Sequence, residues 1–345
     1  MASKRMLIIR FSALGDVAMT VPAIYSLATR YPDLNIDVVT RPFFARLFVN
    51  APANVNVIGV DFKKDYKGVG GMLRLLRRLG QLKPDCVADL HNVLRSWIID
   101  RYFRLRGVKV VMVDKMRAKR SELFRTGQPQ PSFIDRYAKV FAELGYPVGL
   151  TFKSLYQNHT PTLPFEPARP AIGIAPFARY FNKTYPAAQM REVIAKLTAG
   201  GYNVYLFGGR GEEADQLKEW AEATPGCTSL AGLYPLEDEI ALMGAMDAMV
   251  SMDSSNQHMA ALAGTPVISI WGSTTPACGF MGYGQTPERA VCLDIACQPC
   301  SVGGSPECPK GHFDCMNKLS PDTIVDKIRQ TVNASSLPTS EPKHS

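Results

Sequence analysis

Two acidic residues stand where a carboxylate can do chemistry, each at the end of a short apolar run. Asp16 closes the stretch Arg10–Asp16, just after a glycine and just before an apolar helical pattern. A carboxylate in that place can act as a general base toward a hydroxyl within hydrogen-bond reach. It can equally cap the helix that follows, so spacing alone leaves both roles open.

The second acidic residue, Asp253, opens the richest polar cluster of the chain. Hydroxyl, amide and imidazole groups follow it directly and lead into a helix rich in alanine. A helix N-terminus with such groups suits a pyrophosphate or a sugar. A histidine in a helix is more often structural, but here we predict that it lies on the ligand side. The candidates are Asp253, Ser254, Ser255, Asn256 and His258, and Trp271–Pro276 forms a second polar rim.

Cations and glycines follow two further predicted strands. Arg179 and Lys183 suit the clamping of a diphosphate, although a solvated loop is the commoner fate of a lone lysine. Gly208 permits close approach of the backbone to a ligand. Glu212 or the neighbouring Glu213 either accepts hydrogen bonds from ribose hydroxyls or favours the helix dipole. The glycine loop matches neither a full dinucleotide fingerprint nor a P-loop.

A cluster of cysteines near the C-terminus raises the question of a metal. A Cys-x-x-Cys pair followed by further thiols and an imidazole can supply four zinc ligands. The intervals are irregular compared with common zinc modules, and buried reduced thiols or a disulfide are the alternatives. We therefore predict no metal and no required cofactor. The candidate ligands, should a metal bind, are Cys297, Cys300, Cys308, His312 and Cys315.

The elements that position these loops alternate between strand and helix patterns. In the first half, we expect five strands and one clearly amphipathic helix, at Met6–Phe11, Ile36–Thr40, Val55–Val60, Cys86–Leu90, Lys109–Val113 and 68–82. Such alternation predicts an α/β fold with parallel sheets, in which ligands bind beyond the carboxyl ends of the strands. The loop after the first strand, which carries Asp16, is therefore expected at a binding edge.

A proline-rich stretch at 151–170 interrupts the pattern, and the alternation then restarts. The second half is expected to have strands at Ala171–Ala175, Tyr202–Phe207, Ala248–Ser251 and Val267–Trp271, with helices at Ala187–Gly200 and from Glu212. We predict one domain over 1–155, a second over 170–330 and a disordered tail over 331–345. With two such domains, a cleft between them is the natural active site.

Positive charge is concentrated in one segment. Residues 63–125 hold 17 Lys and Arg against 6 Asp and Glu, a net charge of +11 within a chain of net charge +8. Such a segment attracts anionic partners, although a solvated helical face is the simpler reading. No recognised nucleic-acid motif accompanies it. No apolar run approaches the roughly 20 residues of a membrane helix, so we expect a cytoplasmic protein with reduced cysteines.

The motifs at Arg10–Asp16, Asp253–Pro266 and Cys297–Met316 resemble those of glycosyltransferase family 9, the ADP-heptose:lipopolysaccharide heptosyltransferases. The resemblance runs from Leu7 to about Ile328. It implies a GT-B fold of two Rossmann-like domains, an acceptor-binding N-terminal domain and a donor-binding C-terminal domain. It also implies inverting transfer of heptose from ADP-heptose to an inner-core acceptor of lipopolysaccharide, with peripheral contact to the cytoplasmic face of the inner membrane.

The resemblance also implies roles for particular residues. Asp16 matches the general base, Lys183 a lysine that binds the donor phosphates, and Asp253 an acid near the heptose. The loop Ser254–His258 departs from the family pattern of Thr-Gly-x-x-His, because it lacks the glycine. Together with the basic segment, the resemblance predicts that the acceptor is bound by Arg10, Ser12, Asn92, Arg95, Lys119 and Arg120.

Three other functions compete with this prediction. A related GT-B enzyme using another nucleotide sugar, such as an epimerase, would need no separate acceptor. A metal-binding or nucleotide-binding protein without transfer activity would be built around Cys297–Cys315. A nicotinamide-dependent enzyme is disfavoured because a full Gly-x-Gly-x-x-Gly motif is missing.

Overall fold

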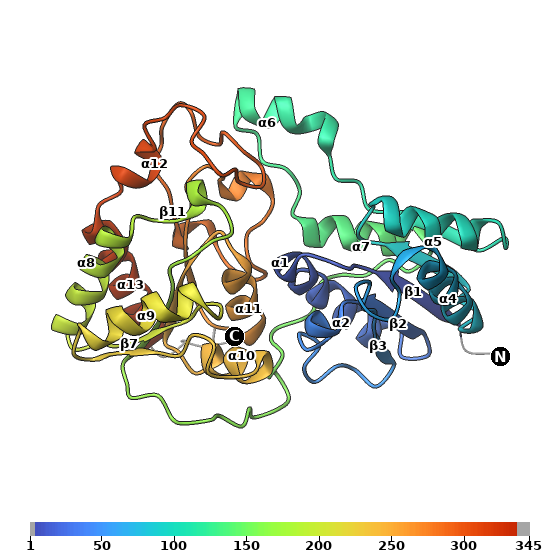
Figure 1. The fold of residues 1–345 in the computed structure, drawn as a ribbon, viewed down its shortest axis with the longest axis horizontal. Helices are drawn as coiled ribbons and strands as arrows, with labels where there is room; N and C mark the ends of the chain where they lie inside the picture. The colour runs from blue at the N-terminus through green and yellow to red at the C-terminus, as the bar shows by residue number, and fades with distance from the viewer. Residues whose placement is uncertain (1–3, 337–345) are drawn as a thin grey trace, which may run out of the picture. The chain divides into compact units, whose positions relative to one another are not determined.

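Two all-parallel sheets organise the chain, as a computed structural model describing residues 4–336 shows (Figure 1). One compact unit runs to Leu123 and resumes over Gln128–Thr160, whereas the other comprises Phe124–Gly127 and the chain from Pro161 onward. No helix or strand lies between residues 144 and 170, which includes the proline-rich stretch. Within the described range, no helix combines the length and apolarity needed to cross a bilayer.

The N-terminal sheet has the strand order β3-β2-β1-β4-β5. Its strands are β1 (Arg5–Ile9), β2 (Asn35–Thr40), β3 (Val55–Gly59), β4 (Cys86–Asp89) and β5 (Lys109–Met112). The central strands β1 and β4 are almost continuously apolar and buried, as expected for parallel strands covered on both faces. The order in which strands are added to the sheet reverses between β1 and β4. The loops after these two strands therefore flank the switch point.

Helices cover both faces of this sheet. One face carries α4 (Gly68–Gln81) and α5 (Leu94–Arg104), whose apolar residues form a single core with the strands. The helix α2 (Thr20–Arg30) packs against α7 (Phe133–Glu143). Shorter helices are α1 (Leu14–Ala18), α3 (Pro42–Ala45) and α6 (Arg120–Thr126), with a 3₁₀ turn at Arg117–Lys119.

The C-terminal sheet has the order β11-β10-β9-β6-β7-β8, the doubly wound arrangement with one strand more. Its strands are β6 (Ala171–Ala175), β7 (Asn203–Leu206), β8 (Cys227–Ser229), β9 (Ala248–Met252), β10 (Val267–Ile270) and β11 (Ala290–Val291). Its longer helices are α8 (Ala187–Ala199), α9 (Glu212–Glu222), α10 (Leu236–Gly244), α11 (Ser255–Ala263) and α13 (Pro321–Ser336), with α12 (Asp314–Asn317) a single turn. The switch point here lies between β6 and β9.

Two predictions about helices need correction. The first apolar helical pattern is not one helix, because α1 ends at Ala18 and α2 begins at Thr20, whose hydroxyl donates to Val17 O at 2.7 Å. The tail predicted to be disordered from residue 331 is helical as far as Ser336, because α13 packs Ile324, Val325 and Ile328 into the core. Residues 337–345 lie outside the described range.

Candidate functional site

The predicted functional loops gather at the switch points of their own sheets. Ser12 and Asp16 follow β1, and Asn92 follows β4. In the C-terminal unit, Lys183 follows β6 and Asp253 follows β9. Crevices beyond the carboxyl ends of the strands at such points are where doubly wound sheets bind ligands. Each unit therefore offers one candidate site.

Asp16 sits in the first turn of α1 and is held in place from two directions. Its Oδ2 accepts a hydrogen bond from the Ala13 N–H at 2.9 Å and pairs with Arg10 Nη2 at 2.8 Å. Its side chain remains 26% exposed, whereas the guanidinium of Arg10 is buried. Both roles suggested by the sequence are thus compatible with the geometry: the carboxylate caps the helix start and also faces solvent.

Arg10 was predicted to bind the acceptor, but its guanidinium instead contacts other residues of the protein. Its Nη1 donates to Leu90 O at 2.6 Å, while Nη2 pairs with Asp16. Burial lowers the pKa of Arg10, but the neighbouring Tyr137, Asp16 and Asp89 outweigh that effect and raise it. A permanently charged guanidinium therefore fixes the orientation of the Asp16 carboxylate.

His91 links the two loops of the N-terminal switch point. The Phe11 N–H donates to Nδ1 at 3.4 Å, which assigns the ring proton to Nε2, 3.4 Å from Ser12 Oγ. Burial and the nearby cations Arg10 and Lys115 lower the pKa of His91 to about 3. The ring is therefore neutral at physiological pH. Its Nε2–H faces the Ser12 hydroxyl oxygen as a hydrogen-bond donor and so orients Ser12.

The other predicted acceptor residues differ in how they are used. Asn92 has a left-handed backbone conformation with φ 50°. Its side chain donates to Val113 O at 2.9 Å and accepts from the Trp97 indole N–H at 2.8 Å. Arg95 is exposed, with its guanidinium 4.7 Å from the centre of the Phe62 ring. Lys119 and Arg120 are exposed at the start of α6. Asn92 thus shapes the loop, whereas the three cations remain accessible to an anionic ligand.

A pair of fully buried carboxyl groups lies beneath this loop. Asp89 Oδ1 accepts from the backbone N–H groups of His91 and Asn92, at 2.8 and 2.9 Å. Its Oδ2 and both oxygens of Asp100 find no donor among the described residues. Burial and the charge of Asp89 raise the pKa of Asp100. A proton retained on Asp100 supplies the donor that the pair otherwise lacks.

Asp253, in the C-terminal unit, is the centre of a buried polar network. Its Oδ2 pairs with Lys183 Nζ at 2.7 Å and accepts from Thr274 Oγ1 at 2.6 Å, while Oδ1 accepts from Gln257 Nε2 at 3.0 Å. The side chains of Asp253 and Lys183 are 5% and 14% exposed. The network fixes an ammonium group at the switch point, where it can neutralise a diphosphate.

The helix α11 begins beside this network. Ser254 is its N-cap and accepts from the Asn256 N–H at 3.4 Å, while Ser255 and Asn256 form the first turn. His258 is buried one turn further on. The first turn thus offers backbone N–H groups and the positive end of the helix dipole next to the Lys183–Asp253 pair.

The remaining donor candidates lie around the same edge. Arg179 is exposed, with its guanidinium 5.3 Å from the centre of the Tyr180 ring. A Cβ at Gly208 would lie 2.7 Å from Leu217 Cδ1, so the glycine permits close packing of α9. Glu213 accepts from the Gly209 N–H at 2.7 Å, whereas Glu212 is exposed at the first position of α9. The geometry therefore favours Glu212 over Glu213 for ligand contact.

The cysteine-rich segment borders the predicted donor-binding loops. The N–H groups of Cys300 and Ser301 both donate to Ser273 O, at 2.9 and 3.0 Å, and a Cβ at Gly304 would lie 2.5 Å from Lys183 Cδ. Cys297 Sγ lies 4.0 Å from His312 Nε2, and all of the cysteines are free thiols. Over residues 4–336, no three His, Cys, Asp or Glu side chains are arranged to hold a metal. The segment therefore packs against the loops that carry Ser273 and Lys183.

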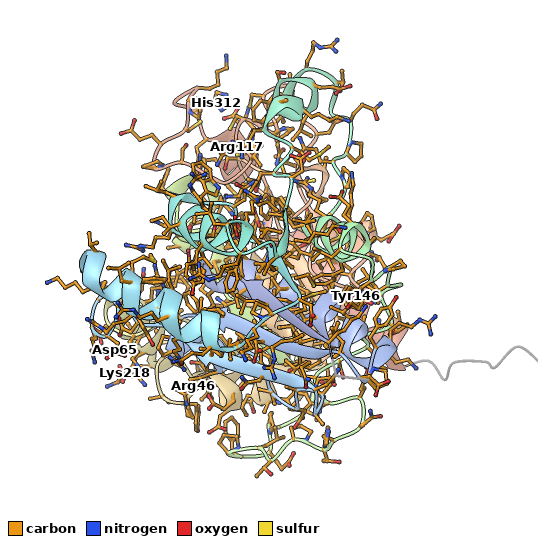
Figure 2. All side chains as sticks on the ribbon, turned by 90° about the vertical axis from the view of Figure 1, so that its right-hand side faces the viewer. Arg46, Asp65, Arg117, Tyr146, Lys218 and His312 are labelled. Carbon is orange, nitrogen blue, oxygen red and sulfur yellow. The ribbon has the colours of Figure 1, made fainter. Side chains whose placement is uncertain are left out.

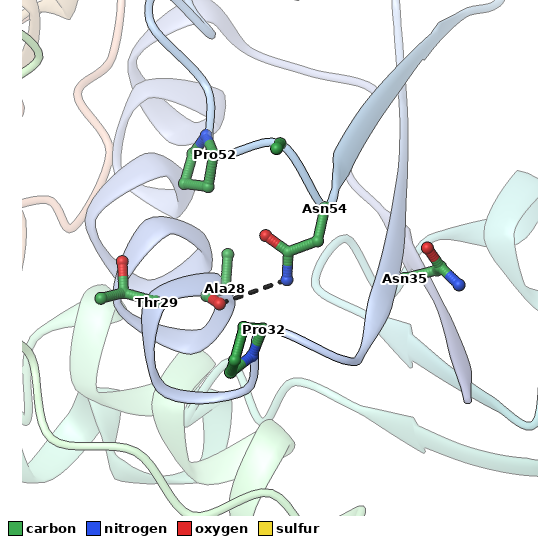
Figure 3. A pocket seen from close by; sticks show the side chains of 7 residues that line it. Ala28, Thr29, Pro32, Asn35, Pro52 and Asn54 are labelled. Carbon is green, nitrogen blue, oxygen red and sulfur yellow. Dashed lines mark hydrogen bonds between the residues drawn. The ribbon is translucent and has the colours of Figure 1, made fainter. Parts of the chain in front are cut away.

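A surface pocket of about 480 Å³ lies elsewhere, at the amino-terminal edge of the N-terminal sheet (Figure 3). It is lined by residues that end α2 and that precede or begin β2 and β3. Asn54 in its wall donates to Ala28 O, Tyr31 O and Leu34 O, which closes the C-terminus of α2. The pocket is therefore separate from the candidate residues, which follow the carboxyl ends of β1 and β4.

Four residues that were not among the individually predicted site residues lie at these switch points. His91 and Lys115 lie at the N-terminal switch point, and Gln257 and Thr274 hold Asp253. The spacing of Gln257, four residues after Asp253 at a helix start, was a usable signal. Thr274 lay within the polar rim that the sequence indicated. Nothing in the local sequence marks Lys115, which reaches Asn92 O at 3.1 Å from the loop after β5.

Comparison with known proteins agrees with this architecture. Residues 72–310 match the model of glycosyltransferase family 9 (heptosyltransferase). The chain is 27% identical to lipopolysaccharide heptosyltransferase 1 of Pseudomonas aeruginosa over 308 residues, which cover 86% of each chain. The sequence similarity thus extends over most of both proteins.

Solved structures share the fold. A family 9 glycosyl transferase from Veillonella parvula superposes with a TM-score of 0.73 at 17% identity, over 97% of this chain and 98% of that one. The E. coli heptosyltransferase WaaC, solved with ADP-2-deoxy-2-fluoro heptose, gives 0.66 at 21% identity, over 94% and 99%. Together with the two strand orders, they confirm the predicted α/β fold of two Rossmann-like domains of the GT-B type.

Proposed function

Because the chain belongs to glycosyltransferase family 9 and is therefore a glycosyltransferase, we propose that it transfers heptose from ADP-heptose to an inner-core lipopolysaccharide acceptor with inversion. The donor is taken by the C-terminal domain and the acceptor by the N-terminal domain. The observation that carries the proposal is the contrast at the two switch points: a solvent-facing carboxylate in one domain and a buried, ammonium-bearing network in the other.

Asp16 is the general base in this mechanism. An acceptor hydroxyl gives its proton to the Asp16 carboxylate as its oxygen attacks the anomeric carbon of the donor. The sugar passes through an oxocarbenium-like transition state, and the bond from the anomeric carbon to the diphosphate oxygen breaks. Arg10 and the Ala13 N–H hold one carboxylate oxygen, Oδ2, so that the carboxylate keeps a fixed orientation while it receives the proton.

The departing diphosphate is stabilised by the C-terminal domain. Lys183 supplies a positive charge whose place is set by Asp253, and Arg179 supplies a second, exposed one. The first turn of α11, with Ser254, Ser255 and Asn256, adds backbone N–H donors. Fixed donors of this kind stabilise charge that develops on a leaving group without further reorganisation.

The acceptor side is matched by charge. The segment 63–125, with its net charge of +11, attracts the phosphates and acidic sugars of an inner core. We propose that the protein meets this acceptor at the cytoplasmic face of the inner membrane. The proposed chemistry uses protein side chains and helix dipoles throughout, so we expect transfer without an added cofactor.

The test is a transfer assay with purified protein, ADP-heptose and an inner-core acceptor, followed by ADP release and by the anomeric configuration of the product. Acceptor-dependent ADP release with inversion is expected. A thermal-shift series with ADP, UDP and GDP checks the donor, because only ADP should stabilise the protein strongly. Product with retained configuration would refute the inverting mechanism, and preference for UDP or GDP would refute the donor.

The competing functions predict other outcomes. An epimerase converts the nucleotide sugar in the absence of acceptor, and a binding protein stabilises with nucleotide but releases no ADP. For the metal-binding alternative, elemental analysis of the purified protein is informative. Stoichiometric zinc whose removal leaves transfer intact would assign a structural role to Cys297–Cys315.

A further inference from the structure

The helices α4 and α5 present large apolar side chains to solvent. In and just after α5, Leu94, Ile98 and Leu105 are 71%, 41% and 72% exposed, and Trp97 is half-exposed. Their opposite faces are already buried against the sheet in the N-terminal core. The exposed residues therefore have no role in that core. Single exposed apolar residues need no explanation, but a group on adjacent elements indicates an interaction surface.

The two helices lie side by side. A Cβ at Gly80 of α4 would lie 2.2 Å from the Tyr102 hydroxyl of α5, and Figure 1 shows the pair together over the N-terminal sheet. In α4, Val69 and Leu73 are exposed in the same way as the apolar residues of α5. We call the outward faces of these two helices, with Leu105, the α4–α5 face.

This face is also strongly basic. The two helices contain six arginines, all exposed: Arg74, Arg77, Arg78, Arg95, Arg101 and Arg104. Their one acidic residue, Asp100, is buried, and Asp65, labelled in Figure 2, lies before α4 begins. Long cationic side chains beside exposed leucine, isoleucine and tryptophan are typical of helices that lie at a bilayer interface. An acidic protein partner would match the charge of the arginines. It would not match the large apolar side chains that lie among them.

The face continues into the proposed acceptor site. Trp97 donates to the Asn92 side chain at 2.8 Å, and Arg95 belongs both to α5 and to the predicted acceptor residues. A bilayer on this face would therefore hold a lipid-linked acceptor close to the loop after β4.

We propose that the α4–α5 face docks on an anionic lipid bilayer. The apolar side chains enter the interface, and the arginines bind lipid phosphates. Only the purpose of this docking, which is to hold a lipid-linked acceptor near its site, rests on the proposed function. Bilayer binding itself requires neither donor nor acceptor. The occupant is a lipid surface and not a second copy of the chain, because six arginines and no exposed acid would repel their own image.

The test is co-sedimentation of the full chain with vesicles of phosphatidylcholine, with and without phosphatidylglycerol. We expect binding to the anionic vesicles that weakens with salt. The triple variant Leu94→Glu, Ile98→Glu, Leu105→Glu should lose roughly tenfold or more of this binding. Leu233→Glu, a similarly exposed leucine of the other unit, is the matched control and should bind as the unchanged protein does.

A second variant separates charge from apolar contact. Arg77→Gln, Arg101→Gln and Arg104→Gln together should reduce binding to anionic vesicles roughly tenfold or more, with Lys218→Gln as the exposed control. Absence of vesicle binding, equal loss in the control variants, or a dimer that the triple glutamate variant dissociates in sedimentation would each overturn the proposal. Transfer to a soluble, de-acylated acceptor is measured in parallel, so that failure of docking is distinguished from failure of the proposed function.

Discussion

The ends of β4 and β9 occupy the same place in the two sheets, next to the first strand of each, and each holds a buried aspartate. Asp253 is surrounded by an ammonium, a hydroxyl and an amide. Asp89 has two backbone N–H groups and a second carboxyl group, that of Asp100. The same position in the topology thus places a buried aspartate beside a cation in one sheet and beside a second carboxyl group in the other.

The difference agrees with the roles that we propose for the two domains. In the C-terminal domain the buried carboxylate holds the Lys183 ammonium, which we propose contacts the donor diphosphate. In the N-terminal domain the buried pair supports the loop, and Asp16, the carboxylate that we propose as the base, lies after β1 and is more exposed. Burial of a charge therefore distinguishes a positioning group from one that must exchange protons with a substrate.

The largest expected effect is that of Asp16→Asn. The amide keeps the shape but cannot accept a proton, so kcat should fall roughly 100- to 10,000-fold. Calorimetric titration with ADP should give an unchanged Kd, because Asp16 belongs to the other domain. Asp135→Asn, at another helix start of the same domain, is the control. Turnover close to that of the unchanged enzyme would remove Asp16 from the base role and leave it as a helix cap.

Next in size is Lys183→Met, which leaves the buried Asp253 without its cation. Breaking one side of a buried ion pair costs about 3 kcal/mol of unfolding free energy, measured by urea denaturation. The double variant Lys183→Met, Asp253→Asn should recover most of that loss, yet bind ADP as weakly as the single variant. Equal stability of the single and double variants would show that the pair is not coupled.

Asp100→Asn tests the contrasting carboxyl pair. The pKa of Asp100 is higher in the folded state than its ordinary value of 3.8. The protonated carboxyl group therefore stabilises the fold fully below pH 3.8, and this contribution is lost as the pH rises through the folded-state pKa. The unfolding free energy should therefore fall with rising pH by up to about 1.4 kcal/mol per unit, and the variant should lack this slope. Asp326→Asn, an exposed change, should retain it.

Thr274→Val is expected to have the smallest effect. The hydroxyl that donates to Asp253 at 2.6 Å is lost, which removes about 2 kcal/mol of stability. The KM for the donor should rise several-fold more than kcat changes, since Lys183 is held less firmly. Thr198→Val, whose hydroxyl donates to Ala195 O on the surface of α8, should leave both unchanged. A fall in kcat alone would argue against a positioning role.

Much of the fold was predictable because its central strands are apolar runs with clear boundaries. Ala171–Ala175, bounded by prolines on both sides, is β6 as predicted. The strand β11 was not predicted, since two residues carry no periodicity and only pairing with β10 defines them. The break between α1 and α2 has no glycine or proline at Met19, so the sequence pattern ran through it.

The loops of the candidate site were predictable, but the partners of each side chain were not. Residue type and position after a strand singled out Asp16, Lys183 and Asp253 as candidates. That Arg10 would be buried against Asp16 depends on Leu90, eighty residues away in sequence, whose carbonyl accepts the second hydrogen bond. The Lys183–Asp253 pair likewise joins loops seventy residues apart.

The position of α13 in the core also sets an order of events during synthesis. Ile324, Val325 and Ile328 complete the same core as β6 and β9, and the segment around Gly304 packs on Lys183 only when it has been made. On the ribosome, the N-terminal sheet has all its strands long before these residues emerge. A nascent chain can therefore assemble its N-terminal sheet early, while the core of its C-terminal unit stays incomplete until α13 has been made.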